Sequence, residues 1–331
     1  MRRNLAQPLF VFGIAEWAST PETAFDAFLA GYQFEGRRLR ASSFRIYQGM
    51  FKRLKLWALE TKRGLFELDA LSLETFLAGK SLSAETRHRY LLLFTTLFEH
   101  LARIRAGEAD TGLVHKHNPA RTLLLEREAP PRVDPDYLNE TEIREFIAAL
   151  PEGEKWKHLR DKAMAILVLG SGLRSGELLA LRTCDLRSKN GKVETVWVQE
   201  HKPHPARQVP LHPWALDVLE EWLRMRESLA TGKAPKYRGK EQRLAGDLLF
   251  PADLAGARST PPTLFRLVKT TLEKAQLIKR YEGPTLLRNS CGALWLTRYE
   301  PLQVSLWLGH TKVSTTERLL PVARRRTKPD R

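Results

Sequence analysis

Four basic side chains, in separate segments of the chain, have the chemistry to bind a phosphate group. Arg174 stands in GSGLRSGELLALR, Lys202 in HKPHPARQVPLH, Arg288 in GPTLLRNS and His310 in LGHTKVSTT. A guanidinium can clamp a phosphate through two parallel hydrogen bonds, and an ammonium can bind it as a point charge. Each residue alone could be an ordinary surface ion pair or helix cap. The four are therefore candidate phosphate ligands.

The elements around these residues indicate how they would be positioned. An apolar helix pattern, AMAILVLG, meets a Gly-Ser-Gly break and a second helix start, which places Arg174 at the tip between two helices. Asn190-Gly191 is a strong hairpin signal, residues 193–198 are rich in β-branched types, and RQVPL reads as a short strand. Lys202 therefore falls in a turn between strands, and Arg288 falls at the start of a helix.

The chain as a whole predicts two helical regions joined by an extended segment. Residues 1–105 carry apolar stripes at helical spacing, for example over 42–60 and 72–78, with basic residues beside them. The segment 106–137 is rich in proline and charge, which is typical of an interdomain linker. Asn139 and Glu142 form a capping-box pattern at the start of the second region.

The second region, residues 138–321, combines these helices with the small sheet, and residues 322–331 form a basic tail. The expected fold class is mainly α with a small β-sheet (α+β).

The charge balance indicates the class of partner. The 331 residues include 54 lysines and arginines against 38 acidic residues, a net charge of +16. Such an excess raises the local concentration of polyanions and favours nucleic acid over a small acidic substrate. The alternative is a basic soluble protein without such a partner.

Other classes of site are disfavoured. Two cysteines, Cys184 and Cys291, make a disulfide framework unexpected and suit a reducing cytosol. His115 and His117 lack the further ligands that a metal site needs, so no metal or cofactor is expected. The N-terminus is interrupted by Glu16 and is not read as a signal peptide, and no apolar run is long enough to span a membrane.

The motifs GLRSGELLALR and LGHTKVSTT, in this order and with Arg288 between them, resemble those of the tyrosine recombinase (phage integrase) family. The resemblance covers most of the chain. It implies that residues 1–105 form the helical (SAM-like) core-binding domain of that family. It also implies that residues 138–321 form its catalytic-type domain.

The resemblance implies a reaction as well. In this family a tyrosine hydroxyl attacks a phosphodiester, which gives a 3′-phosphotyrosine and a free 5′-hydroxyl without ATP, a metal or another cofactor. By resemblance, Arg174 and Arg288 stabilise the negative charge of the transition state and Lys202 protonates the leaving oxygen. His310 would hydrogen-bond the same phosphate, and Glu177 would support Arg174.

Two positions depart from the family pattern. Thr285 stands where the His-x-x-Arg box has its histidine. Leu319, nine residues after His310, stands where the nucleophilic tyrosine is expected. None of the seven tyrosines follows His310, so a local shift of the alignment cannot supply one. We therefore expect a phosphate pocket that lacks its nucleophile.

Other hydroxyl groups are poor substitutes for the missing phenol. Ser314, Thr315 and Thr316 are close in sequence, but an aliphatic alcohol is a poorer attacking and leaving group and no activating base is evident. Tyr281 and Tyr299 flank the arginine box, where a nucleophile would approach from the wrong element. Strand cleavage is therefore not expected.

These observations predict a site-specific double-stranded DNA-binding protein of this fold that is unable to cleave DNA. It would act as an accessory factor, a regulator or a replication initiator of a plasmid or mobile element. One alternative is a divergent active recombinase that uses a non-standard nucleophile. Another is a decayed integrase with no retained function.

Ten residues are expected to contact DNA; three of them, Arg40, Lys52 and Arg207, are weaker candidates for backbone contacts, as are the tail arginines 324–326. The ten are Arg40, Arg45, Lys52, Arg87, Arg89, Arg174, Lys202, Arg207, Arg288 and His310. The expected partner is double-stranded DNA at a specific or repeated site, with self-association on DNA. The expected location is the bacterial cytoplasm, at the nucleoid or a plasmid.

Overall fold

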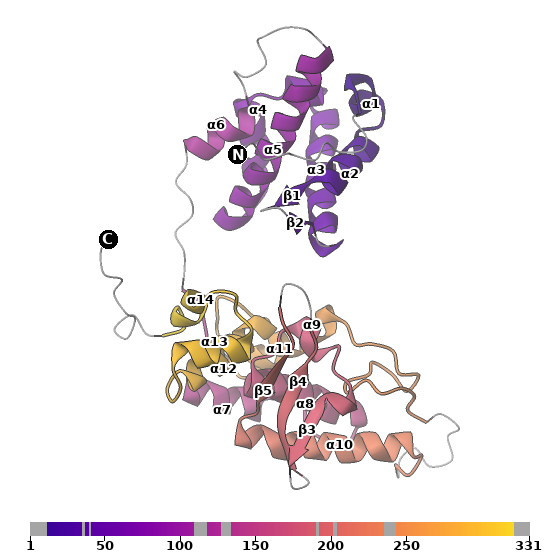
Figure 1. Ribbon diagram of the computed structural model, residues 1–331, viewed down its shortest axis with the longest axis vertical. Coiled ribbons are helices and arrows are strands. Elements are labelled where there is room, and N and C mark those ends of the chain that lie inside the picture. Colours follow the sequence, from indigo (N-terminus) through magenta and orange to yellow (C-terminus); the bar gives the residue numbers. More distant parts are fainter. Residues whose placement is uncertain are drawn as a thin grey trace. The chain divides into compact units, whose positions relative to one another are not determined.

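The computed structural model describes residues 12–34, 37–39, 41–108, 118–126, 134–189, 192–200, 204–234 and 243–320 (Figure 1). The chain divides into two compact units, residues 1–132 and 133–331. Each unit has its own apolar core. Within the described ranges, no helix has both the length and the apolar character needed to cross a membrane.

The first unit is almost entirely helical. Its elements in chain order are α1 (Ile14–Ser19), α2 (Pro21–Gly31), β1 (Gln33–Phe34), β2 (Arg37–Arg38), α3 (Ala41–Glu60), η1 (Leu65–Glu67), α4 (Ala70–Ala78), α5 (Ala84–Glu108) and α6 (Pro119–Leu125). The strands β1 and β2 form a short antiparallel pair that the sequence did not predict.

Aromatic side chains fill the core of the first unit. The rings of Phe25 on α2 and Phe51 on α3 stack with their centroids 4.1 Å apart, and Trp17 meets Phe51 edge-on. Most of the apolar stripe predicted over 42–60 is the buried side of α3, but Leu56, expected in the stripe, is exposed, as are Arg45 and Lys52 on the same helix. Burial of this stripe leaves the side chains of Arg45 and Lys52 open to solvent or a ligand.

The predicted linker 106–137 differs from the structure. The helix α5 continues to Glu108, and α6 packs against α4 and α5 with Ala120 and Leu123 in the core. Asn118 fixes this helix: its side-chain oxygen accepts from the N–H of Arg121, and its amide donates to the carbonyl of Thr95 at 2.7 Å. The proline and charge of the segment concealed this short helix, because its three buried residues leave little periodicity in the sequence.

The second unit combines helices with one sheet. Its elements are α7 (Glu140–Ala148), α8 (Trp156–Ser171), α9 (Ser175–Leu178), η2 (Thr183–Asp185), β3 (Leu186–Lys189), β4 (Lys192–Val198), β5 (Arg207–Pro210), η3 (Pro213–Ala215), α10 (Leu216–Ala230), α11 (Pro261–Lys274), α12 (Pro284–Trp295), α13 (Pro301–Leu308) and α14 (Val313–Glu317).

The helix α8 is the centre of the second unit. Every residue from 163 to 171 is buried, and α10, α11 and α12 pack against the helix. It ends at Gly172, whose φ of +63° is the left-handed conformation that glycine adopts without strain. A Cβ at this glycine would lie 2.5 Å from Cδ2 of Leu308, so the close approach of α13 also requires glycine.

The sheet is antiparallel with the order β3-β4-β5. Leu186 pairs with Val196 in the first ladder, and Val196 pairs with Val209 in the second. The small sheet within a mainly helical chain confirms the predicted fold class. The turn at Asn190-Gly191 itself lies outside the described residues.

Candidate functional site

Arg174 stands at the N-cap of α9, where its orientation is set by two acceptors. Its guanidinium Nη1 donates to Oε1 of Glu177 at 2.9 Å, and its backbone N–H donates to Oε2 of the same carboxylate at 2.8 Å. Nη2 donates to the carbonyl oxygen of Gly309 at 2.6 Å. The side chain remains 30% exposed. Arg174 is therefore fixed in place and still open to a ligand.

Arg288 on α12 lies below the surface and binds the ends of two helices. Nη1 donates to the carbonyl of Gly172 at the end of α8, and Nη2 donates to that of Leu308 at the end of α13, both at 2.6 Å. Helix C-termini carry unpaired carbonyls and a partial negative charge, so these are favourable partners for a guanidinium. Burial, and next the charge of Arg174, lower the pKa of Arg288 to about 9, so it stays protonated at neutral pH.

The end of α13 brings these two arginines together. Arg288 binds the carbonyl of Leu308, and Arg174 binds that of the next residue, Gly309. Gly309 has a φ of +65° and lies in the left-handed region. The conformation turns consecutive carbonyls toward guanidiniums that come from α9 and α12. The structure thus places both predicted phosphate-binding arginines at one helix end.

His310 follows directly and is held neutral. Its Nδ1 lies 2.8 Å from Oγ1 of the buried Thr316, and its backbone N–H donates to the carbonyl of Ser305. Burial lowers the pKa of His310 to about 3, and the charges of Arg288, Arg174 and others act in the same direction. A neutral imidazole has one donor and one acceptor nitrogen. When Thr316 donates to Nδ1, the proton lies on Nε2, which can donate to a phosphate oxygen.

Glu177 is the carboxylate of this cluster. Burial raises its pKa, but hydrogen bonds from Arg207 and Arg174 and their charges lower it to about 2. Nη1 and Nη2 of Arg207, on β5, donate to the two carboxylate oxygens at 3.0 and 2.9 Å. The prediction that Arg207 contacts DNA differs from this arrangement, because its guanidinium is directed at acceptors of its own chain.

Gly309 is essential to this geometry, and we predict that Gly309→Ala lowers the free energy of unfolding by about 1–3 kcal/mol. The alanine would adopt a positive φ, and its Cβ would lie 2.8 Å from Cζ of Arg207. Urea unfolding measures the loss. Gly176→Ala in α9 is the matched control, because a Cβ there meets nothing within 4 Å. Equal stability of the two variants would contradict the assigned role of Gly309.

The position of the expected nucleophile is part of the core. Leu319 is 2% exposed and belongs to the apolar cluster of the second unit. A Cβ at Gly292 of α12 would lie 2.6 Å from Cδ1 of Leu319, so this side chain rests directly on the helix. Thr285 is exposed in the first turn of the same helix, one turn before Arg288. Neither position offers a base or a nucleophile.

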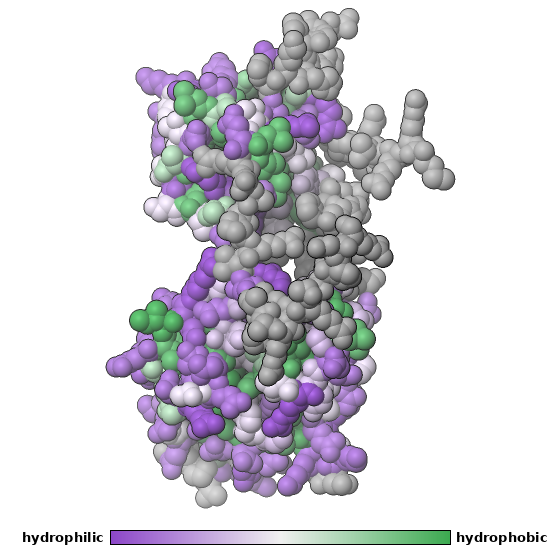
Figure 2. Space-filling view, turned by 90° about the vertical axis from the view of Figure 1, so that its left-hand side faces the viewer, coloured by the Kyte–Doolittle hydropathy of each residue, from purple (hydrophilic) through white to green (hydrophobic). Residues whose placement is uncertain are grey.

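Several predicted contacts lie outside the described residues. These are Lys202, Arg40 and the tail arginines 324–326. On the first unit, Arg45 and Lys52 of α3 and Arg89 of α5 are exposed, and Arg87 is half-buried. On the face seen in Figure 2, hydrophilic residues cover much of the described surface of both units.

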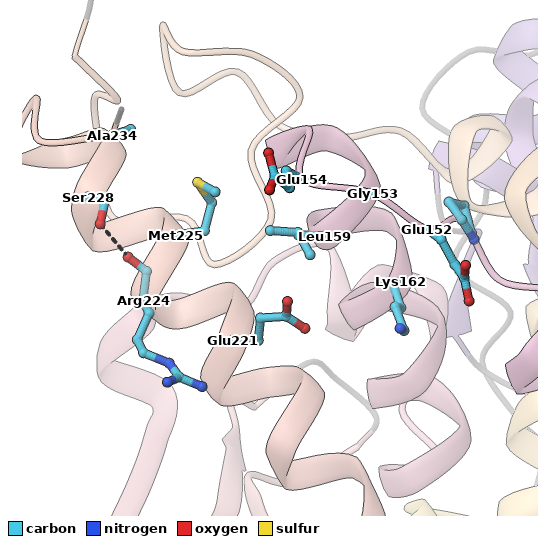
Figure 3. A pocket seen from close by; sticks show the side chains of 11 residues that line it. Glu152, Gly153, Glu154, Leu159, Lys162, Glu221, Arg224, Met225, Ser228 and Ala234 are labelled. Carbon is cyan, nitrogen blue, oxygen red and sulfur yellow. Dashed lines mark hydrogen bonds between the residues drawn. The ribbon is translucent and has the colours of Figure 1, made fainter. Parts of the chain in front are cut away.

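A cavity of about 780 Å³ lies elsewhere in the second unit, between the start of α8 and the later turns of α10 (Figure 3). Leu159, Met225, Glu221, Lys162 and Arg224 are among the residues that line it. Carboxylates and basic groups both line it, so it has no single charge preference. The lining residues do not include Arg174, Glu177, Arg207, Arg288 or His310, so the cavity is not part of the candidate site.

Some features of the site were not evident from the sequence. These features are the roles of Gly172, Gly309, Thr316 and the Arg207–Glu177 pair. The glycine directly after the apolar run LWL was a usable signal, because glycine commonly ends a helix in the left-handed conformation. The pairing of Arg207 with Glu177 carries no such local signal.

Comparison with known proteins gives consistent matches. The model of the phage integrase family matches residues 136–323. Tyrosine recombinase XerD of Proteus mirabilis is 27% identical over 294 residues, which is 88% of this chain and 86% of that protein. Its counterpart in Vibrio cholerae is 25% identical over 322 residues, 95% of this chain and 97% of that protein.

Solved structures share the fold. XerH site-specific recombinase bound to difH substrate matches with a TM-score of 0.63 and 22% identity, over 84% of this chain and 76% of that one. A lambda integrase dimer bound to a COC′ core site matches with a TM-score of 0.61 and 16% identity, over 96% and 99%. The predicted architecture is thereby confirmed.

Proposed function

Because this chain belongs to the phage integrase family of tyrosine recombinases, we propose that it binds double-stranded DNA, holds a backbone phosphate between Arg174 and Arg288, and does not cut the strand. The observation that carries the proposal is that the phosphate-binding arginines are in place while the position of the nucleophile is not available for chemistry. Both guanidiniums are held at the end of α13, while Leu319 is packed into the core.

The proposed chemistry follows from the groups at the site. The guanidiniums supply charge-assisted hydrogen bonds to the phosphate oxygens, and neutral His310 adds a donor at Nε2. Cleavage would require an oxygen nucleophile to attack phosphorus while the bond to the 5′-oxygen breaks and that oxygen gains a proton. Leu319 carries no such oxygen. The phosphodiester would therefore be bound and remain intact, whatever proton Lys202 could deliver.

The net charge of +16 supports a polyanionic partner. The exposed Arg45, Lys52 and Arg89 add cationic side chains on the first unit. Contacts of this kind go mainly to phosphates and fix the register of a protein on the duplex. We therefore propose that the first unit contributes backbone contacts, which would make binding strongly dependent on salt concentration.

Two measurements with the full chain test the proposal. Selection from a pool of duplexes with randomised sequence should enrich a site that the protein then protects in a footprint. A nicked suicide duplex that carries this site should give no covalent protein–DNA adduct after denaturation in detergent. Failure to enrich any site would contradict specific binding. An adduct would contradict the absence of cleavage.

An active recombinase is the second candidate, because the relatives matched over most of the chain are named tyrosine recombinases. Ser314 and Thr315 on α14 are exposed hydroxyls close to His310 in sequence. If either attacked phosphorus, the suicide duplex would trap it, and mass spectrometry would identify the phosphorylated residue. Absence of that product favours the binding role.

The biological role that we propose is an accessory factor, a regulator or a replication initiator of a plasmid or mobile element, in the bacterial cytoplasm. Such roles need site recognition without strand cleavage. We also propose self-association on repeated sites. Cooperative footprints on duplexes with two sites, and independent binding to duplexes with one, would support it. Identical affinities on the two duplexes would contradict it.

A further inference from the structure

The guanidinium of Arg207 is surrounded by acceptors of its own chain. Besides its two hydrogen bonds to Glu177, Nε donates to the carbonyl of Trp307 at 2.8 Å, and Nη2 lies 3.4 Å from that of Leu308. Arginine has five N–H donors, and four contacts here are internal. The side chain is 9% exposed. Arg288 is similarly buried but makes two internal contacts, so Arg207 has fewer donors left for a DNA phosphate than Arg288 has.

Arg174 differs from Arg207 in this respect. Within the part of the chain that the structure describes, two of its five donors have protein partners, namely Glu177 and the carbonyl of Gly309. The remaining donors and the 30% exposure of the side chain leave room for a phosphate.

Arg207 binds one of the two acceptors that orient Arg174, and it also binds the backbone directly before the other. Oε1 of Glu177 accepts from Nη1 of Arg174 and from Nη1 of Arg207, at 2.9 and 3.0 Å. The carbonyl of Gly309 follows directly on those of Trp307 and Leu308, which Arg207 contacts. A displacement of Arg207 would therefore move both supports of Arg174.

From this arrangement we infer that Arg207 is a positioning residue: it fixes Glu177 and the end of α13, and these hold Arg174 in the orientation that meets a DNA phosphate. The inference rests on the proposed DNA binding. It replaces the direct backbone contact that the sequence suggested for Arg207.

The buried charge of Glu177 is a second reason to expect that Arg207 controls the orientation of Arg174. Glu177 is one buried carboxylate between two guanidiniums. Without Arg207, the hydrogen bonds left to Glu177 among the described residues come from Nη1 and the backbone N–H of Arg174, and a buried carboxylate with so few partners is strongly unfavourable. Arg174 is the guanidinium already bound to it. Arg174 would turn onto the carboxylate and away from the phosphate.

A double-mutant cycle tests this dependence. Arg207→Gln, Arg174→Gln and the double variant are titrated with mixed-sequence duplex DNA at low salt, which needs no knowledge of the preferred site. Each single substitution should weaken binding about 10-fold, the effect of one charge-assisted hydrogen bond. In the Arg174→Gln background, Arg207→Gln should add less than about 2-fold, since coupled residues are not additive.

Two further results distinguish a positioning role from direct contact. Arg207→Lys should bind as weakly as Arg207→Gln, because a lysine cannot hold both carboxylate oxygens and a carbonyl at once. In the Arg174→Gln background, the slope of log K against log salt should not change with Arg207→Gln. If Arg207 bound a phosphate itself, its replacement would reduce the slope by about 0.9.

A measurement on the wild-type protein avoids any failure of the variants to fold. Phenylglyoxal modification followed by mass spectrometry should show that duplex DNA protects Arg174, while Arg207 reacts slowly with or without DNA. Single effects that multiply to about 100-fold in the double variant would overturn the inference. Rescue by lysine, or rapid modification of Arg207 that DNA blocks, would also overturn it. A wild-type protein that binds no duplex would overturn the proposed function and the inference with it.

Discussion

Glu177→Gln is expected to lower the free energy of unfolding by about 3–5 kcal/mol at neutral pH, because it leaves two guanidiniums without their carboxylate. The Glu177 side chain is 8% exposed and receives hydrogen bonds from Arg174 and Arg207. The amide of glutamine can accept through one oxygen only, and its NH₂ group would face a guanidinium. DNA binding should weaken as well, since Arg174 loses its support.

The pH dependence of this loss follows from the pKa of Glu177, which is about 2 in the folded protein against an ordinary 4.5. A carboxyl group whose pKa is lowered by folding stabilises the folded state at pH values above its pKa in the unfolded chain. This stabilisation is lost as the pH falls through its pKa in the folded protein. The difference in free energy of unfolding between wild type and Glu177→Gln should thus have its largest value above pH 4.5 and should shrink toward pH 2.

Urea unfolding from pH 7 down to pH 3 measures this difference. Glu227→Gln, at an exposed position on α10, is the matched control and should change the stability by less than about 0.5 kcal/mol. A difference for Glu177→Gln that is small at pH 7, or that grows as the pH falls, would contradict the assigned ion pairs.

Leu319→Tyr is expected to destabilise the protein by about 1–3 kcal/mol and to yield no covalent adduct with the suicide duplex. The tyrosine would have to occupy a buried site that rests on Gly292, beside Leu308. An overpacked core pushes neighbouring side chains out of their preferred rotamers. Restoring the residue type would therefore not restore a nucleophile near Arg174 and Arg288.

Urea unfolding and the adduct assay on the same preparation test this prediction. Leu319→Met is the control, because it conserves volume and should cost less than about 1.5 kcal/mol. If Leu319→Tyr were as stable as wild type and formed an adduct, the segment after His310 would have to leave α12 readily, and the account of Leu319 as a core residue would be wrong.

Local features of the second unit could be predicted well from the sequence. The capping box of Asn139 and Glu142 begins α7 as expected, with Glu142 donating its N–H to Asn139 Oδ1 at 3.0 Å. The β-branched run after Asn190-Gly191 forms β4, paired with β3. These features depend on residues within a few positions of one another, so the sequence contains the whole interaction.

Elements with weak local patterns were missed. The helix α6 places only a few residues in the core, and its proline marks a helix start as readily as a loop. The pair β1–β2 has two residues in each strand, too few for an alternating pattern. For α6, part of the stabilisation comes from a neighbour distant in sequence, as the bond from Asn118 to Thr95 shows.

The sequence alone determined which chemical groups this protein has: two arginines and a histidine in family order, a leucine and a threonine at the positions of nucleophile and base, and an excess of positive charge. Only the tertiary structure decided what these groups do to one another. Arg174 meets a carbonyl 135 residues later, Arg207 makes four contacts with acceptors of its own chain, and Leu319 is buried. The reason is physical: hydrogen-bond partners and burial are set by long-range packing, which spacing along one segment does not encode.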